Sequence, residues 1–409
     1  MDDELIERIA ASLPKEEAEQ ARNAALADRV SSYFIRIEGL KYVGIAGLGT
    51  HGGTIIFNDN RADPRRRIVI KYSHSRKADW DLKNERSFLN MFRGSEHIVQ
   101  RIPLAEVELD IAGQGRRPTI ALEYIPNGTL MDFRKRMDES RNRLPSRFLW
   151  QVYLCLVRHV IAMAYPSFGL ENAPQMRERI RTTDGPYAIM QNSPHSLNIM
   201  IGDMSVDIEE HIFIPIFKLI DFGHGRIEAD WRETMRKNIF YIGKFIFLSQ
   251  REVDESYLDM MPQGGYDYAF THPSTGRRQW IETQAPPFFT RVTNIDIDLR
   301  DLIARCMALN EADVPSLEEL VMLCENGARK GPQDIHYEND QVDTMQTERD
   351  EALRLIVQRF IFDANVIEEE KPEIKWRPRT THMGTTLLGL NADISRFEAP
   401  PEPSQDDVD

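Results

Sequence analysis

Hydrophobic positions change their spacing along the chain, and each spacing predicts a different kind of element. Residues 1–35 place Leu5, Ile6, Ile9 and Leu13 at helical intervals, which predicts an N-terminal helix. Short apolar runs with strand character follow, separated by one helical stretch. The predicted strands cover residues 41–46, 54–57, 68–72 and 119–124, and the predicted helix covers residues 79–92.

The second half of the chain has a mainly helical pattern. From residue 148 onward it is interrupted by two strand-like stretches, at 198–201 and 211–220. One more helix is predicted at 338–364, followed by a proline-rich acidic tail without fixed structure. A β-rich first part and an α-rich second part predict an α+β protein of two lobes, with a cleft between them.

Composition restricts the possible partners. The 409 residues include 51 Lys+Arg and 65 Asp+Glu, and 51 − 65 gives a net charge of −14. Broad nucleic-acid binding needs dense positive charge, so we expect no nucleic-acid partner. The three cysteines are far apart in sequence, which excludes a disulfide scaffold and any zinc site built mainly on thiolates.

The sequence also predicts an intracellular location, cytoplasmic or nuclear, without membrane contact. The first ten residues are acidic and lack the apolar core of a secretory signal. The most apolar stretch, 148–168, is interrupted by Gln151, Arg158 and His159. A buried amphipathic helix therefore fits this stretch better than a membrane span.

A glycine-rich segment lies between the first two predicted strands. Gly47, Gly49 and Gly52 allow a turn to bring backbone N–H groups close to phosphate oxygens. A strand follows this turn, whereas a dinucleotide-binding fold needs a helix N-terminus at that point.

Charged and amide side chains follow the glycine-rich segment in a fixed order. Lys71 ends an apolar strand and Glu85 lies on the next predicted helix. A lysine directed inward from a strand needs a carboxylate or a phosphate to offset its desolvation. Much later, Asn198 and Asp221 lie on two loops, and their oxygens would suit a Mg²⁺ ion that also touches phosphates.

In this order the motifs resemble those of the eukaryotic protein kinase superfamily, over residues 42–328 and including Asp221-Phe222-Gly223. The resemblance implies a bilobed protein-kinase-like fold, with a small β-rich N-lobe and a larger α-helical C-lobe. It also implies ATP and Mg²⁺ as cofactors. The implied divisions are an N-terminal helical extension (1–36), an N-lobe (37–126), a C-lobe (127–330) and a C-terminal helix with an acidic tail (331–409).

The resemblance also assigns roles to individual residues. Lys71 would hold the ATP phosphates and pair with Glu85, while the backbone of Glu123 and Ile125 would receive the adenine. The implied cofactor-binding residues are Gly47, Gly49, Gly52, Lys71, Glu85, Leu122 (the gatekeeper position), Glu123 and Ile125, and the implied metal ligands are Asn198 and Asp221.

The catalytic loop departs from the kinase pattern H-R-D-x-x-x-x-N. Counting back from Asn198 places Ser193 at the position of the catalytic Asp, with Gln191 and Asn192 at the His and Arg positions. His195 takes the place of the usual lysine. Serine cannot act as a carboxylate base near neutral pH, and general bases contribute roughly 10²–10⁴-fold to rate. This replacement argues against ordinary phosphotransfer.

The segment after Gly223 departs as well. Only fourteen residues (224–237) separate Gly223 from Asn238, which begins a motif similar to the start of the large C-lobe helix. No A-P-E motif is present, and Val314 stands where its arginine partner would lie. We therefore expect the platform that docks peptide substrates to be missing or reduced.

Three stretches are longer than the resemblance predicts. Residues 59–67 and 169–190 each carry a small basic cluster, and residues 202–216 form an extended connection between two strand-like runs. Either basic cluster could dock an acidic partner or remain solvated.

Three interpretations remain open from the sequence. The first is a pseudokinase that binds ATP and Mg²⁺ and acts as a regulator or scaffold for an unidentified protein partner. The second is an active unconventional kinase for protein Ser/Thr residues or a small molecule, with His195 or the 169–190 segment supplying the missing role. The third is an interaction protein with an empty pocket, in which Lys71 and Asp221 pair with each other or with Glu85.

Overall fold

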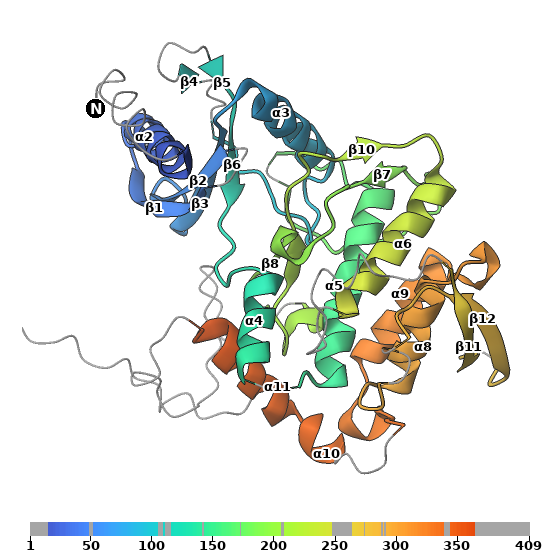
Figure 1. Cartoon of the computed structure of the whole chain (residues 1–409). Helices are drawn as coiled ribbons and strands as arrows, with labels where there is room; N and C mark the ends of the chain where they lie inside the picture. Colours follow the sequence, from blue (N-terminus) through green and yellow to red (C-terminus); the bar gives the residue numbers. More distant parts are fainter. Residues whose placement is uncertain are drawn as a thin grey trace, which may run out of the picture.

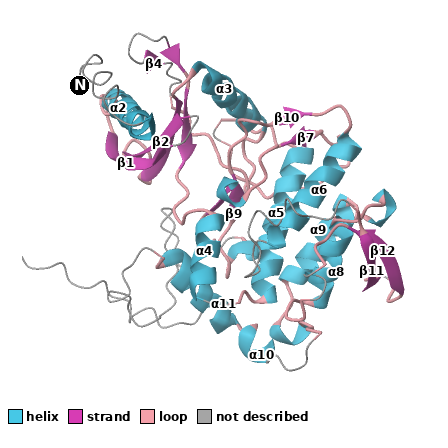
Figure 2. Cartoon of the chain, viewed as in Figure 1, coloured by secondary structure: helices cyan, strands magenta, loops and turns pink. Residues whose placement is uncertain are grey.

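The structure is a computed structural model and shows a mixed α+β protein (Figure 1). Strands predominate in the N-terminal part and helices in the rest of the chain (Figure 2). The described residues are 15–48, 52–104, 109–110, 116–140, 143–171, 173–205, 208–247, 264–273, 275–287, 289, 292–338 and 344–364.

A four-stranded antiparallel sheet forms the N-terminal part, with the order β1-β2-β3-β6. Each of the four strands predicted there lies at least largely within one strand of the sheet. Buried and partly exposed residues alternate along β2, so one face of the sheet is covered. The elements are α2 (Lys15–Phe34), β1 (Leu40–Leu48), β2 (Gly52–Asp59), β3 (Arg66–Ser73), α3 (Arg76–Met91), β4 (Leu109–Asp110), β5 (Arg116–Arg117) and β6 (Thr119–Glu123).

Helix α2 covers one face of this sheet. Its residues Ala27, Val30 and Phe34 are buried, and the Phe34 ring lies 5.9 Å from the ring of Phe57 on β2. These residues share one core with Ile55 of the sheet. The predicted N-terminal helix is therefore present from Lys15 onward, while residues 1–14 lie outside the described part of the chain.

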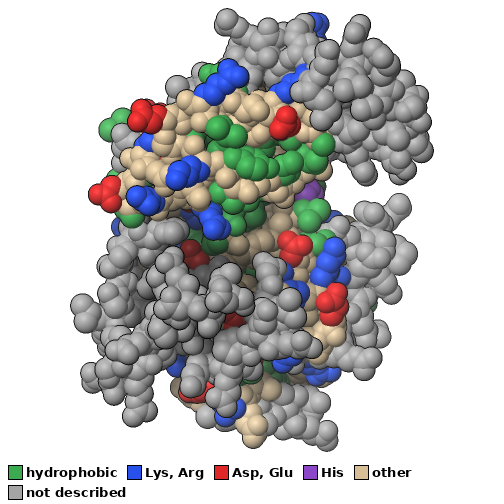
Figure 3. Space-filling model, turned by 90° about the vertical axis from the view of Figure 1, so that its left-hand side faces the viewer, with side chains coloured by type: hydrophobic (Ala, Val, Ile, Leu, Met, Phe, Trp, Pro, Cys, Tyr) green, Lys and Arg blue, Asp and Glu red, His purple; other side chains and the backbone are tan. Residues whose placement is uncertain are grey.

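The edge strand β1 presents apolar side chains to the surface. On the molecular face shown in Figure 3, hydrophobic side chains gather in the upper half, where the four-stranded sheet lies. The exposed apolar residues of β1 are Tyr42, Val43, Ile45 and Leu48.

The helical part is built around α5 (Ser146–Ala164), which is buried along almost its whole length. This is the most apolar stretch of the sequence, and its burial within the protein agrees with the predicted core helix. No helix among the described residues is long and apolar enough to cross a membrane. The surrounding helices are α4 (Leu130–Ser140), α6 (Trp231–Phe247), α8 (Ile297–Cys306) and α9 (Leu317–Ala328).

Several short elements occupy the segments between these helices. They are β7 (Ile189–Met190), η1 (Ser196–Asn198), β8 (Ile199–Ile201), η2 (Glu209–His211), β9 (Phe217–Leu219), β10 (Arg226–Ile227), β11 (Tyr266–Thr271), β12 (Arg278–Thr283), η4 (Glu311–Asp313) and η5 (Pro332–Asp334). The predicted strand at 211–220 was too long, because only its last residues pair with β8. The hairpin β11–β12 was not predicted.

Helix α6 begins earlier than the motif at Asn238 indicated. The Asp230 carboxylate accepts a hydrogen bond of 2.8 Å from the backbone N–H of Arg232, so the helix begins at Trp231. Asn238 lies inside the helix, where its Nδ2 donates to the carbonyl of Ile189 at 2.9 Å.

The predicted helix at 338–364 is divided into α10 (Thr344–Thr347), α11 (Asp350–Val357) and the π-helical turn η6 (Gln358–Phe362). Between the first two, the buried Glu348 carboxylate accepts hydrogen bonds from the backbone N–H groups of Ser146 (2.7 Å) and Arg147 (3.0 Å). The C-terminal segment is thus fastened to the first turn of α5. Residues 365–409, where an acidic tail is predicted, lie outside the described residues.

Candidate functional site

A cleft of about 670 Å³ lies between the four-stranded sheet and the helical part. Most of the residues singled out from the sequence line it, although they come from distant parts of the chain. Ser193 is absent from the lining, and Gly49 lies outside the described residues. The predicted residues that line the cleft are Gly47, Gly52, Lys71, Glu85, Leu122, Glu123, Ile125, His195, Asn198 and Asp221.

Three charged groups meet at one wall of this cleft. The Nζ atom of Lys71 lies 2.6 Å from Oε2 of Glu85 and 3.4 Å from Oδ1 of Asp221. Lys71 faces the cleft because Ile70 and Tyr72, its neighbours on β3, turn toward the core under α2. Glu85 lies on the inward face of α3 and is only 1% exposed.

The electrostatics of this group follow from one ammonium facing two carboxylates. Burial opposes the charged form of Lys71, but Glu85 and Asp221 outweigh it and raise the lysine pKa. Burial, with the nearby Asp221 charge, raises the pKa of Glu85 to about 7 despite the opposing effect of Lys71. Burial would also raise the pKa of Asp221, yet Lys71 and the Gly223 N–H lower it below its ordinary value. All three charges therefore have partners within the chain. This pairing is the one expected for an interaction protein with an empty pocket.

A tight turn directs Asp221 into the cleft. Its backbone has a φ of +63°, a left-handed conformation that Asp tolerates better than most residues. The N–H of Gly223 donates to Oδ1 of Asp221 at 3.1 Å. The Phe222 ring is fully buried, with its centre 4.7 Å from that of Phe92 and 6.1 Å from that of Phe88.

Two side chains to which the sequence analysis gave no role at this turn hold it in place. Asn84, next to Glu85 on α3, donates from Nδ2 to the carbonyls of Gly223 and Gly225, both at 2.9 Å. Gln191 donates from Nε2 to the carbonyl of Asp221 at 2.7 Å. The sequence signal that could have identified Asn84 is its position as a polar residue next to Glu85, a glutamate predicted to be buried.

The loop with the altered catalytic motif is closed by its own hydrogen bonds. The Ser193 carbonyl accepts from Asn198 Nδ2 and from the His195 N–H, each at 3.0 Å. The Nε2 atom of His195 lies 3.2 Å from Asn198 Nδ2, so it is an acceptor and the ring hydrogen is on Nδ1. This buried Nδ1 has no hydrogen-bond partner among the described residues.

The segment after β6 offers backbone groups to the cleft. The Glu123 N–H donates to the Gln100 carbonyl at 2.9 Å, and the Glu123 carboxylate accepts from Lys218 Nζ at 2.7 Å. Within the described part of the chain, the N–H and C=O of Ile125 form no hydrogen bond. Leu122 is buried beside them and contributes an apolar wall.

Packing alone accounts for one of the two described glycines that were assigned to the phosphates. A Cβ atom on Gly52 would lie 1.9 Å from the carbonyl oxygen of Tyr72, so the close approach of β2 and β3 already requires glycine there. A Cβ on Gly47 would have its nearest neighbour, Thr54 Oγ1, at 3.5 Å, which is an ordinary contact.

The basic clusters are largely paired within the protein. Arg61 and Arg66 contact the Asp59 carboxylate at 2.7 and 3.4 Å, and Arg177 lies 2.9 Å from Glu210. This pairing weakens the interpretation of these clusters as sites for an acidic partner.

No protein-family model matches this chain, and comparison with curated proteins finds no significant match. Functional inference therefore depends on the geometry described above.

Proposed function

We propose that the chain has a two-lobed, protein-kinase-like fold, binds ATP with Mg²⁺ in the cleft, and acts as a regulator or scaffold. The sheet with α2 and α3 would form the N-lobe, and the helices around α5 the C-lobe. The observation that carries the proposal is the Lys71 ammonium held by Glu85 and Asp221 in the wall of a cleft of about 670 Å³.

The two ends of the cleft differ in a way that suits a nucleotide. Ligand sites commonly measure about 300–1,000 Å³ and combine apolar walls with a few polar groups. Leu122 and Val69 line one end, beside the backbone of Ile125, which forms no hydrogen bond within the described residues, and this end suits a flat heteroaromatic ring. Lys71 and Asp221 lie at the other end, where phosphates and their cation would bind.

The donor set also suits Mg²⁺. Asp221 is ionised, because its pKa is lowered, and the amide side chain of Asn198 lines the same cleft. Oxygen donors of this kind are the ligands that Mg²⁺ prefers, and it would neutralise phosphate charge between them. Asp221 would hold the ion, with Asn198 as the second protein ligand.

A regulatory role is favoured over catalysis by the loop at 191–198. Ser193 supplies no carboxylate to orient a substrate hydroxyl, and its carbonyl is engaged by Asn198 and His195. The general-base contribution of about 10²–10⁴-fold is absent at this position.

The decisive experiment is calorimetric titration of the full chain with ATP and Mg²⁺, beside a thermal-shift assay. We expect saturable binding by the wild type and at least tenfold weaker binding by Lys71→Met. Lys83→Met, an exposed lysine on α3, is the matched control and should bind as the wild type does. Circular dichroism should show that each variant is folded. No binding at millimolar ATP would refute the proposal and leave an interaction protein with an empty cleft.

The position of His195 favours a second candidate, an active unconventional kinase. The ring lines the cleft, lies beside Asn198 and has a buried Nδ1 without a partner among the described residues. Transfer from radiolabelled ATP, abolished by both Asp221→Asn and His195→Ala, would favour this candidate. ATP binding without transfer would favour the regulator.

A further inference from the structure

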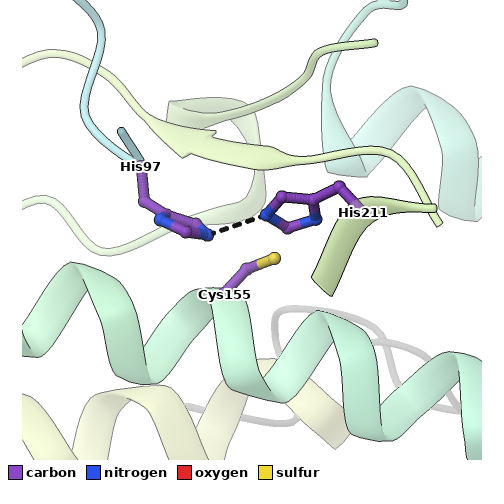
Figure 4. A group of neighbouring side chains, drawn as sticks. All are labelled: His97, Cys155 and His211. Carbon is purple, nitrogen blue, oxygen red and sulfur yellow. Dashed lines mark hydrogen bonds between the residues drawn. The ribbon is translucent and has the colours of Figure 1, made fainter. Parts of the chain in front are cut away.

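A second group of side chains with metal-binding chemistry lies outside the cleft. His97 follows α3, Cys155 is in the middle of α5, and His211 ends the short helix η2. All three are buried, at 0%, 1% and 1% exposure. Their ligand atoms lie within 4.8 Å of one another. Figure 4 shows the two imidazoles turned toward each other, with the sulfur of Cys155 beside them.

When Glu178 is ionised, the hydrogen bonds around the two imidazoles indicate which nitrogen carries the hydrogen. Nδ1 of His97 lies 2.7 Å from the Glu178 carboxylate, which also accepts the His97 backbone N–H at 2.7 Å. The His211 ring donates to the backbone of Ile214, and Nδ1 is the donor because Nε2 faces His97. A fully buried imidazole is neutral and carries one ring hydrogen.

Both Nε2 atoms therefore present a lone pair, and they face each other at 3.1 Å. Two acceptors at this distance repel unless a cation lies between them or one ring changes its tautomer. A carboxylate or carbonyl that orients the outer nitrogen is the usual support of a metal-bound histidine.

The third group completes a soft ligand set. Burial raises the pKa of the Cys155 thiol, and a hydrogen bond from the backbone N–H of Phe217 opposes this only in part. A cation would therefore bind Cys155 by displacing the thiol proton. The carbonyl of Phe217 is in turn 2.9 Å from Nε2 of His159. Two imidazoles and one thiolate match Zn²⁺ better than Mg²⁺ or Ca²⁺, which require oxygen ligands.

The spacing of the two nitrogens also fits. Tetrahedral zinc with Zn–N distances of about 2.0–2.1 Å places its nitrogen ligands about 3.3 Å apart. The observed 3.1 Å needs only a small adjustment. We propose that His97, Cys155 and His211 bind one zinc ion, which joins the segment after α3 to α5 and η2, with one coordination position left for water. This inference is independent of the proposed nucleotide site.

Metal analysis of the full chain, purified without a histidine tag, tests the site. We expect about one Zn²⁺ per chain in the wild type and less than a tenth of that in Cys155→Ala. Cys324→Ala, which alters another fully buried cysteine, is the matched control and should retain its zinc.

Cobalt substitution gives a readout that does not depend on the variants folding. Wild-type protein stripped by a chelator and reloaded with Co²⁺ alone should show d–d bands of a tetrahedral site and a thiolate-to-cobalt charge-transfer band. Loss of zinc should also lower its melting temperature. If the wild type takes up less than about a tenth of an equivalent of Zn²⁺ or Co²⁺, or Cys155→Ala retains full zinc, the proposal is wrong and the histidines are a hydrogen-bonded pair.

Discussion

Asn84 on α3 holds the carbonyl of Gly225 at 2.9 Å from its Nδ2 atom, across 141 residues of sequence. The same Nδ2 donates to Gly223, so both of its hydrogens are used on the turn that follows Asp221. One side chain thus couples the helix that carries Glu85 to the loop that carries Asp221.

Replacing Asn84 with alanine should lower the free energy of unfolding by about 1–3 kcal/mol, because two carbonyls lose their donor. Hydrogen exchange at Gly225 and its neighbours should become faster. Ser87→Ala is the control, since this exposed side chain on α3 donates to the Lys83 carbonyl within its own helix. Urea denaturation gives the comparison, and a loss below about 0.5 kcal/mol would contradict the coupling.

The buried Glu85 carboxyl should make stability depend on pH in a definite direction. Its pKa is about 7 in the folded protein and 4.5 in the unfolded chain. The folded protein therefore retains a proton between these values, and stability falls as pH rises. Protonation of Glu85 adds at most about 3 kcal/mol to the free energy of unfolding. This stabilisation is fully present below pH 4.5 and is lost as the pH rises through about 7.

Urea denaturation between about pH 4 and pH 8, a range that spans both pKa values, measures how the free energy of unfolding changes with pH. The Glu85→Gln variant removes this titration, so the difference between wild type and variant isolates it from other groups. A difference that stays constant over the window would show that folding does not raise the pKa of Glu85.

Tyr72 provides a test of an unsatisfied hydroxyl. Its side chain is 2% exposed, burial raises its pKa to about 12, and its hydroxyl has no hydrogen-bond partner among the described residues. Tyr72→Phe should therefore raise the free energy of unfolding by about 1 kcal/mol. Tyr268→Phe should lower it by a similar amount, because that hydroxyl donates to Asp301 at 2.6 Å. Equal effects of the two substitutions would refute this explanation.

The anchoring of the C-terminal segment can be tested at Glu348. This residue is 0% exposed, and its carboxylate accepts the N–H groups of Ser146 and Arg147 at the start of α5. Glu348→Ala should lower the free energy of unfolding by about 1–3 kcal/mol. Glu351→Ala, an exposed glutamate three residues away, should change it by less than about 0.5 kcal/mol in the same thermal or urea titration.

The elements that the sequence predicted well are those whose pattern is local. Alternating apolar residues on β2 and β3 sit on one sheet face, and the apolar run of α5 is buried on nearly every side. The mixed α+β class is thereby confirmed. Lys71 and Glu85 also meet as expected, because a strand and the following helix place them in one cleft.

The features that the sequence missed depend on contacts between distant residues. His97, Cys155 and His211 each look like an ordinary core residue within their own segment, and only the fold brings their ligand atoms together. The division of the last predicted helix has the same origin, since Glu348 is held by the start of α5. The cap at Asp230, which begins α6 before Asn238, was also missed.

The Glu348 cap has a consequence for synthesis of the chain on the ribosome. Ser146 is made 202 residues before Glu348. At about 5–20 residues per second, the first turn of α5 would wait on the order of 10–40 s for the side chain that satisfies it. The central helix therefore leaves the ribosome with its starting amides in water, and its final packing is reached only when translation is well advanced.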